Sequence, residues 1–314
     1  MSAPRWVSAA EQGSLVTIGE CADALAAALH DAPHGNSPRQ EPQRKGLDLG
    51  NGQLLVMPSA STGHIGVKLI TVADPMAAIA GPRIQGLHVQ FDALTLAPKA
   101  ILDGIALTNL RTAAVSILAL RSLADPSSGE LLVFGAGPQA HSHARAVAAE
   151  WPIRRIRVAT RTRESAQLFV DDLTRELPTI DIVPLAPEEV EHAICVADII
   201  VCATTAATPV FGAPPRDGAA IVAVGSHSPR QREIPGPLVM RAYVVVEDRE
   251  IALREAGDIV LAIEDGLLTP EDIDADLGEL VRGARVVVAG PRLFKSVGMA
   301  WQDAVVADAI LARI

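Results

Sequence analysis

The amino-acid sequence predicts an α/β protein with two domains, one built on a doubly wound parallel sheet and one of mixed α+β structure. The chain has 314 residues, which is more than one domain usually contains. Hydrophobic residues make up 49% of it and aromatic residues only 3%, so Ala, Val, Leu and Ile must fill a core of helices packed on a parallel sheet. The third observation is that short apolar strands alternate with helical segments after Gly129.

The first third of the chain mixes helical and strand patterns. An Ala/Leu-rich segment predicts a helix, short apolar runs predict strands, and alternating polar and apolar residues predict a hairpin. The expected elements are a helix over Gly19–His30, a loop through Arg39, strands at Leu54–Met57 and Ile65–Val72, a hairpin over Gly86–Leu96 and Ala100–Leu102 with its turn at Ala97–Lys99, and a long helix beginning near Leu110. We therefore assign residues 1–118 to the α+β domain.

The second part of the chain begins with a βαβ unit. Its expected elements are strands at Leu131–Phe134 and Ile156–Ala159 on either side of a helix over Pro138–Glu150, then strands at Asp198–Ala203, Ala220–Val224, Tyr243–Glu247 and Arg285–Ala289. This order is typical of a doubly wound sheet, which we place in residues 119–298. The final helix is expected to leave this sheet and pack on the first domain, so that residues 299–314 complete it.

Charge and composition exclude several classes of function. Acidic residues number 37 and basic residues 27, which gives a formal net charge of −10, so we expect no nucleic-acid partner. Because the sequence has no membrane-spanning apolar run and no signal-peptide pattern, we expect a cytoplasmic protein that does not bind membranes. The 3 cysteines lack CxxC spacing, and His141 and His143 point to different faces of their helix, so we expect neither disulfides nor a metal site.

A glycine-rich turn between a strand and a helix predicts a dinucleotide site of the Rossmann type. The turn consists of Gly135, Ala136, Gly137, Pro138, Gln139 and Ala140. The first glycine permits a tight turn, the second lets the backbone approach a pyrophosphate, and the alanine allows close helix packing. The alternative is a purely structural turn, but the strand before it, the helix after it and the second strand favour dinucleotide binding.

The end of the second strand of the βαβ unit indicates which cofactor is bound. An acidic residue there would bind the ribose diol of NAD, whereas cationic and hydroxyl groups accommodate the 2′-phosphate of NADP. The chain has Thr160, Arg161, Thr162 and Arg163 at this place. The sequence therefore favours NADP(H), with NAD as the alternative, or a solvated turn with no cofactor contact.

Three cations lie within apolar sequence. Lys68 lies inside a predicted strand, Arg111 lies near the start of a predicted helix, and Arg44 precedes the first apolar strand. An unpaired buried charge costs several kcal/mol, on the order of the desolvation penalty of an ion, so such residues need a partner or a ligand. Together the three could bind a carboxylate, although a cation of this kind taken alone is more often a surface or snorkelling side chain.

At these residues the chain resembles the ornithine cyclodeaminase/mu-crystallin family over nearly its whole length. The segments that resemble family signatures, in family order, are Pro42–Arg44, Val67–Thr71, Leu107–Ala114, Phe134–Ala140, Ala197–Ile200, Gly225–Pro229 followed by Glu233, Glu255–Gly257 and Phe294–Gly298. The resemblance implies that Arg44, Lys68 and Arg111 hold the substrate carboxylate. It also implies a homodimer formed through the α+β domain, which would then serve for substrate binding and dimerisation.

The resemblance assigns further residues to the cofactor. The residues that match family positions near the nicotinamide are Ala203, Thr204, Val297 and Gly298. Thr112, next to Arg111, is assigned to the cofactor as well.

One position departs from the cyclodeaminases of this family. They carry an acidic residue in the Gly-x-Asp-x-Pro loop, where it resembles a general base, and this chain has His227 there. A histidine with a pKa near 6.5 does not supply the same fixed negative charge. The chain is more similar to family members that reduce cyclic imines, so we expect NADPH-dependent reduction of Δ1-pyrroline-2-carboxylate or Δ1-piperideine-2-carboxylate to L-proline or L-pipecolate.

In this hypothesis the imine nitrogen must be protonated, and the two candidate catalytic acids are His227 and Lys68. His227 could equally be a loop residue without a proton role. Asp303, in the final helix, is expected to be an acid on the helix surface. The alternative functions are an ornithine cyclodeaminase, a reductase of imines formed between an amino acid and a keto acid, and a non-catalytic NADPH-binding protein.

Overall fold

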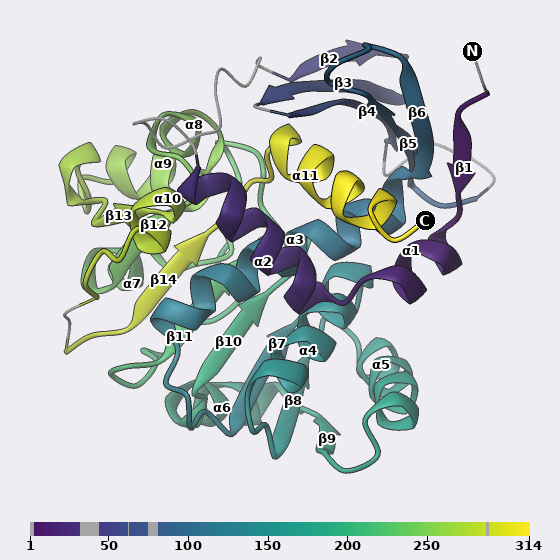
Figure 1. The fold of residues 1–314 in the computed structure, drawn as a ribbon. Coiled ribbons are helices and arrows are strands. Elements are labelled where there is room, and N and C mark those ends of the chain that lie inside the picture. The colour runs from purple at the N-terminus through teal and green to yellow at the C-terminus, as the bar shows by residue number, and fades with distance from the viewer. Residues whose placement is uncertain (1–2, 32–43, 62, 75–80, 287–288) are drawn as a thin grey trace. The chain divides into compact units, whose positions relative to one another are not determined.

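The computed structural model describes residues 3–31, 44–61, 63–74, 81–286 and 289–314, and the chain in it divides into two units. The first unit comprises residues 1–115 and 299–314, and the second comprises residues 116–298. Figure 1 shows a sheet with helices in each unit. The predicted combination of a parallel α/β sheet with an α+β unit is therefore confirmed. No helix in the described part of the chain is long and apolar enough to cross a membrane.

The first unit contains a six-stranded sheet with the order β1-β6-β5-β4-β3-β2. Its strands are β1 (Arg5–Val7), β2 (Lys45–Asp48), β3 (Gly52–Ser61), β4 (His64–Ala73), β5 (Ile84–Phe91) and β6 (Pro98–Asp103). Neighbouring strands are antiparallel except for β1 and β6. The helices that begin in this unit are α1 (Ala9–Leu15), α2 (Ile18–His30), α3 (Gly104–Leu123) and α11 (Ala300–Leu311).

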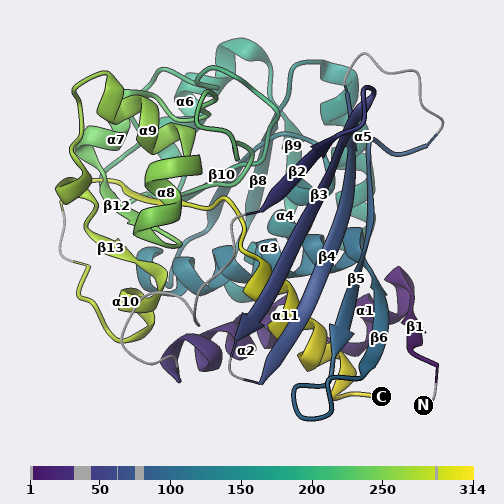
Figure 2. The ribbon, with the colours of Figure 1, turned by 90° about the horizontal axis from the view of Figure 1, so that it is seen from above.

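Helix α11, the last helix of the chain, packs against β3, β4, β5 and α2 (Figure 2). Nine of its residues are buried, as expected for a helix covered on several sides. In the structure the final helix thus packs within the first unit. Because α11 lies against the middle strands of the sheet, polar residues on its sheet-facing side meet the inward residues of β4 and β5.

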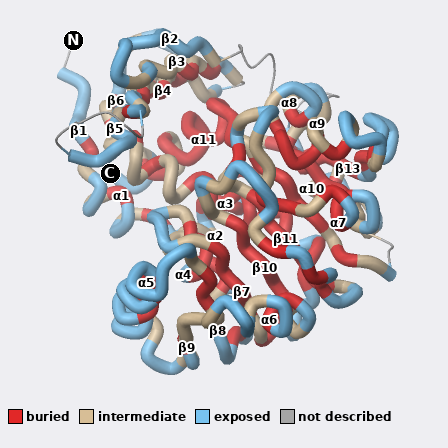
Figure 3. The backbone as a smooth tube through the Cα atoms, turned by 180° about the vertical axis from the view of Figure 1, so that it is seen from behind, coloured by how far each residue is buried: buried red, intermediate tan, exposed pale blue. Residues whose placement is uncertain are grey.

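The second unit contains an eight-stranded, fully parallel sheet with the order β13-β12-β14-β11-β10-β7-β8-β9. Its strands are β7 (Glu130–Phe134), β8 (Arg155–Ala159), β9 (Asp181–Pro184), β10 (Ile199–Cys202), β11 (Ala220–Ala223), β12 (Tyr243–Val246), β13 (Ala275–Asp276) and β14 (Arg292–Lys295). All residues of β10 and β11 are buried (Figure 3), as apolar strands covered on both faces should be. The strand order reverses between β7 and β10, the place where doubly wound sheets bind nucleotides.

Helices connect these strands. They are α4 (Pro138–Glu150), α5 (Arg163–Glu176), α6 (Val190–Val196), α7 (Gly236–Arg241), α8 (Arg249–Glu255), α9 (Gly257–Glu264) and α10 (Leu277–Val281), with short 3-10 turns at Pro187–Glu189 and Pro270–Asp272. The helix predicted over Pro138–Glu150 coincides with α4, and the strands predicted at 131–134, 156–159, 198–203, 220–224 and 243–247 correspond to β7, β8, β10, β11 and β12.

Two predicted boundaries are wrong, and one predicted strand is misplaced. The hairpin turn lies before Pro98 rather than at 97–99, because Asp92 accepts hydrogen bonds from the backbone of Leu94 and Thr95. Helix α3 begins at Gly104 rather than near Leu110, because the Asp103 carboxylate accepts the backbone N–H groups of its first turn.

The last strand of the sheet is β14 (Arg292–Lys295) and not Arg285–Ala289. Residues 285, 286 and 289 lie outside any strand, and 287–288 lie outside the described residues, as does the loop predicted through Arg39. Strand β14 pairs with both β11 and β12, and it buries Leu293 and Phe294. The choice between the two segments therefore depended on sheet pairing, which apolar composition does not reveal.

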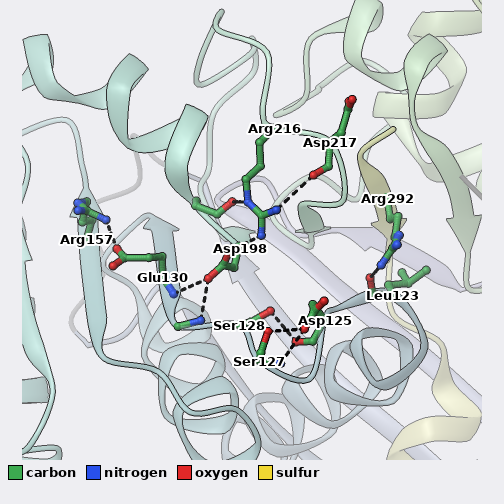
Figure 4. A network of polar contacts seen from close by, with 12 residues as sticks. Leu123, Asp125, Ser127, Ser128, Glu130, Arg157, Asp198, Arg216, Asp217 and Arg292 are labelled. Carbon is green, nitrogen blue, oxygen red and sulfur yellow. Dashed lines mark hydrogen bonds and ion pairs between the residues drawn. The ribbon is translucent and has the colours of Figure 1, made fainter. Parts of the chain in front are cut away.

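A polar network joins the amino ends of β7 and β10 to the middle of β8 (Figure 4). The Asp198 carboxylate accepts the backbone N–H groups of Gly129 at 2.7 Å and Glu130 at 2.9 Å. Arg216 pairs with Asp198, and Arg157 pairs with Glu130. These contacts hold the strand starts in register and lie at the edge of the sheet opposite to the dinucleotide turn, so we assign them a structural role.

Candidate functional site

Lys68 lies on the inward face of β4, the face covered by α11. Its register neighbours are Met57 on β3 and His88 on β5. The side chain is 1% exposed, and its Nζ atom lies 2.6 Å from the Asp303 carboxylate. A longer hydrogen bond of 3.4 Å joins the same nitrogen to the hydroxyl of Thr108. Lys68 is therefore a buried cation with an anionic partner, as its apolar sequence context requires.

Arg111 reaches the same carboxylate from α3. Its Nε atom lies 3.2 Å from Asp303 Oδ1, and its Nη1 atom donates to Gln302 Oε1 at 3.2 Å. Within the described part of the chain, its Nη2 atom has no hydrogen-bond acceptor. A guanidinium held in this way keeps one side of its fork for a planar anion such as a carboxylate.

Arg44 lies just before β2 and is close enough for its charge to affect Lys68. Burial lowers the pKa of Lys68 to about 8, the charges of Arg111 and Arg44 lower it too, and Asp303 opposes them. The structure thus brings the three predicted cations into one electrostatic neighbourhood. Lys68 and Arg111 together carry two positive charges against the one negative charge of Asp303.

Asp303 was expected on the surface of the last helix, and this prediction is wrong. Its side chain is 0% exposed and contacts both Lys68 and Arg111. Burial alone would raise its pKa, but these two cations hold the pKa of Asp303 below its usual value. The signal that was missed is the context, because an acid within a helix that is apolar on most sides has no aqueous face to occupy.

His88 adds a buried, neutral group to this cluster. Its Nε2 atom lies 2.7 Å from Gln90 Oε1, and Gln90 in turn donates to the backbone of Ala304 on α11. Burial lowers the pKa of His88, so the ring is uncharged at neutral pH. Gly66 leaves room for this ring, because a Cβ atom there would lie 2.5 Å from His88 Nε2.

The predicted dinucleotide turn lies at the carboxyl end of β7, the strand at the switch point. Gly135 has a φ of +107°, and a Cβ atom there would lie 2.5 Å from the carbonyl oxygen of Ala203. Gly137 precedes α4 with no side-chain cap, and a Cβ atom there would meet nothing within 4 Å. Packing therefore does not require glycine at 137, whereas close approach of a phosphate to the helix N-terminus does.

The other residues of this turn fit the same interpretation. Pro138 begins α4, and Ala140 is fully buried, so that the helix packs closely on the sheet. His143 fixes the first turn of α4, because its Nδ1 atom lies 2.7 Å from the backbone oxygen of Gln139 and its Nε2 atom 2.8 Å from the hydroxyl of Ser116. His143 and Ser116 both belong to the second unit.

The residues expected to read the ribose follow β8. Arg161, Thr162 and Arg163 are exposed, and Thr162 caps α5 by accepting the backbone N–H of Ser165. The sequence between the strand and this cap has no acidic residue. Two guanidinium groups beside a helix N-terminus form a surface that suits a phosphate.

Two buried glutamates, which the sequence analysis did not assign, shape the loops at this edge of the sheet. Glu233 accepts the backbone N–H groups of Thr204 and Gly225, each at 2.7 Å. Burial raises the pKa of Glu233. Glu247 accepts the backbone N–H groups of Val297 and Gly298, each at 2.8 Å. Each carboxylate thus binds backbone next to residues predicted to contact the nicotinamide.

A buried ion pair supports the same loops. Lys295 Nζ lies 2.9 Å from Asp258 Oδ2 and donates to the backbone oxygen of Ser226 at 2.6 Å. The other oxygen of Asp258 accepts the backbone N–H groups of Glu233 and Ile234. In the sequence, Lys295 and Asp258 are marked as candidates for such a pair by being charged residues within apolar segments.

His227 and Thr112 belong to different units of the chain. His227 is exposed in the loop after β11 and belongs to the second unit. The Thr112 hydroxyl donates to the backbone oxygen of Thr108 within α3. Within the described residues, no group of three His, Cys, Asp or Glu side chains is arranged to hold a metal.

Comparison with known proteins agrees with the resemblance found in the sequence. The model of the ornithine cyclodeaminase/mu-crystallin family matches residues 5–314. A Δ1-pyrroline-2-carboxylate reductase of Bacillus cereus is 35% identical over 98% of this chain and 95% of its own length. The ketimine reductase mu-crystallin of Rattus norvegicus is 35% identical over 82% of this chain and 80% of its own length.

A solved structure gives the same result. The Δ1-pyrroline-2-carboxylate reductase of Thermococcus litoralis, in complex with NADH and L-proline, superposes with a TM-score of 0.89 and 28% identity, covering 98% of this chain and 97% of that chain. Family model, sequence relatives and fold agree over nearly the whole length, and the chain belongs to the ornithine cyclodeaminase/mu-crystallin family.

Proposed function

We propose that this protein is an NAD(P)H-dependent ketimine reductase that converts Δ1-pyrroline-2-carboxylate or Δ1-piperideine-2-carboxylate to L-proline or L-pipecolate. The observation that carries the proposal is the cluster in which Lys68 and Arg111 share one buried carboxylate. The names of the relatives support it, because both sequence relatives are reductases of cyclic or ketimine substrates.

The substrate carboxylate would bind to Lys68, Arg111 and Arg44. Asp303 neutralises one of the two positive charges of Lys68 and Arg111, so a substrate carboxylate would balance the other. The Nη2 group of Arg111 offers N–H donors to such a ligand. This geometry suits an α-imino acid, whose carboxylate is bonded directly to the reacting carbon.

A nicotinamide dinucleotide fits the turn from Gly135 to Ala140, where Gly137 leaves open space at the start of α4. When bound there, it supplies the hydride for C2 of the imine. Ala203, Thr204, Val297 and Gly298 would surround the nicotinamide, in loops held by Glu233 and Glu247. Arg161, Thr162 and Arg163 favour NADPH over NADH, because they supply cations and a hydroxyl for the 2′-phosphate.

The ring nitrogen must carry a proton while C2 is reduced. Lys68, with its pKa lowered to about 8, is able to donate a proton near neutral pH, and His227 is the second candidate. His227 in place of an acid favours reduction over the cyclodeaminase reaction, which needs a fixed negative charge at the substrate ammonium.

We further propose a homodimer formed through the first unit. The sheet face opposite to Lys68 carries apolar side chains on successive strands, including Leu54, Leu69 and Leu87, which the registers place on one face. Leu47, opposite Leu54, is 54% exposed, and Leu87 is 36% exposed. A contiguous apolar face of this kind is typical of a permanent interface.

The decisive experiment mixes purified protein with Δ1-pyrroline-2-carboxylate and either NADPH or NADH, and follows the absorbance of the reduced cofactor. A parallel assay contains ornithine and NAD. Oxidation of NADPH with formation of proline supports the reductase. Release of ammonia from ornithine without imine reduction would show a cyclodeaminase, and cofactor binding without turnover would indicate a non-catalytic binding protein.

A further inference from the structure

Asp303 divides its two carboxylate oxygens between the two buried cations of the site. Oδ2 lies 2.6 Å from Lys68 Nζ, and Oδ1 lies 3.2 Å from Arg111 Nε. Lys68 comes from β4 and Arg111 from α3, whereas Asp303 comes from α11. A single carboxylate therefore sets the distance between two cations on different elements.

The groups packed around Lys68 show why this anion is needed. Arg111 and Arg44 both disfavour its charge, and His88, its neighbour on β5, is held neutral by burial. Thr108 offers only a hydroxyl, at 3.4 Å. Among the described residues that affect Lys68, Asp303 is the group whose charge favours the ammonium form.

The start of α11 keeps Asp303 in this position. Asp303 lies in the first turn of the helix, where the helix dipole favours a carboxylate. The preceding residue, Gln302, accepts the backbone N–H of Met299 at 3.1 Å and the Nη1 group of Arg111 at 3.2 Å. The same turn thus fixes the carboxylate and the orientation of the arginine.

We propose that Asp303 is a positioning residue for the reductase, which holds Lys68 and Arg111 at a fixed separation and keeps Lys68 cationic to receive the substrate carboxylate. This inference rests on the proposed function for its kinetic consequences. Its consequence for Lys68 itself does not depend on any substrate, because the ion pair exists in the free protein.

Lysine-selective NMR tests the inference directly. The chain has only 4 lysines, Lys45, Lys68, Lys99 and Lys295, so their Cε and Nζ signals can be assigned by single substitutions and titrated individually. In Asp303→Asn, the titration midpoint of Lys68 should fall by roughly one to three pH units, as expected when an adjacent opposite charge is lost. The midpoint of Lys295, which pairs with Asp258, should not change.

Kinetics supply the second readout. For the imine, kcat/KM of Asp303→Asn should fall on the order of tenfold or more, the value of a charge-assisted contact. The decline of kcat/KM at alkaline pH should begin at lower pH than in the wild type, because Lys68 loses its proton earlier. The matched control is Asp308→Asn on the same helix, which removes contacts to His64 and Lys99 at the unit surface and should change neither midpoint nor kinetics.

An unchanged Lys68 midpoint in Asp303→Asn would overturn the inference, as would a loss of kcat/KM that is equal at all pH values. If the wild type reduces no imine but the Lys68 midpoint falls as expected, the proposed function fails and the positioning role stands. If Asp303→Asn does not fold, Asp303→Glu serves instead. It retains the charge but alters the spacing, so KM should rise while the Lys68 midpoint stays near its wild-type value, and a fallen midpoint would contradict the inference.

Discussion

The buried pair between Lys295 and Asp258 predicts a large loss of stability when one partner is removed. Both side chains are 0% exposed, and Nζ lies 2.9 Å from the carboxylate. Replacing Lys295 with Met keeps the length and apolar stem but leaves the carboxylate without its cation. Removing one partner of a buried pair typically costs about 3–5 kcal/mol. The expected fall in the melting temperature is about 6–20 °C for a unit of this size.

Urea unfolding followed by circular dichroism measures this loss in Lys295→Met, in Asp258→Asn and in the double variant. The two residues are in contact, so the double variant should lose less free energy of unfolding than the sum of the single variants, by about 1 kcal/mol or more. The control is Arg232→Met, which breaks a pair with Asp265 at the surface and should cost about 0–1 kcal/mol. Single losses no larger than this control, and additive in the double variant, would refute the reasoning.

Three further predictions concern the cofactor loops and the cation cluster. Gly225→Ala should lower the free energy of unfolding by about 1–3 kcal/mol and raise KM for the cofactor, because a Cβ atom there would lie 2.1 Å from the Thr204 carbonyl oxygen. An unchanged KM would contradict a role of the Gly225 loop in cofactor binding. Arg161→Ala should raise KM for NADPH by about tenfold, the value of one phosphate contact, and leave KM for NADH unchanged, whereas equal effects on both cofactors would remove Arg161 from phosphate recognition. In the wild type, kcat/KM for the imine should be steady below pH 8 and fall about tenfold per pH unit well above it. The reason is that Lys68, whose pKa is lowered to about 8, loses its charge there. A profile that stays flat to pH 10 would exclude a charged Lys68 from substrate binding.

Most of the second unit could be predicted from the sequence because its signals are local. The glycine-rich turn lies between an apolar strand and a helix with Pro at its first position, and α4 therefore begins and ends where expected. The last strand was placed wrongly because both 285–289 and β14 (Arg292–Lys295) contain apolar residues. Only pairing with β11 and β12 distinguishes them, and pairing is not visible in one sequence.

The candidate site was predictable in part. Lys68 and Arg111 were predicted as site residues because a charge in an apolar segment needs a partner. Their partner, Asp303, was wrongly predicted to lie on the helix surface. Asp303 lies 192 residues from Arg111 in the chain, so no local pattern connects them. Glu233 and Asp258 were missed for the same reason, since each bonds to backbone groups of a different element.

The path of the chain through the first unit sets the order in which its charged centre is completed. Helix α11 supplies Asp303 and follows the second unit in the chain, whereas β4, which carries Lys68, precedes it. During synthesis the amino-terminal part emerges first. Residues 116–298 must therefore be synthesised before α11 can cover the inner face of the sheet and Asp303 can pair with Lys68. The first unit therefore cannot be completed until the second unit has been synthesised.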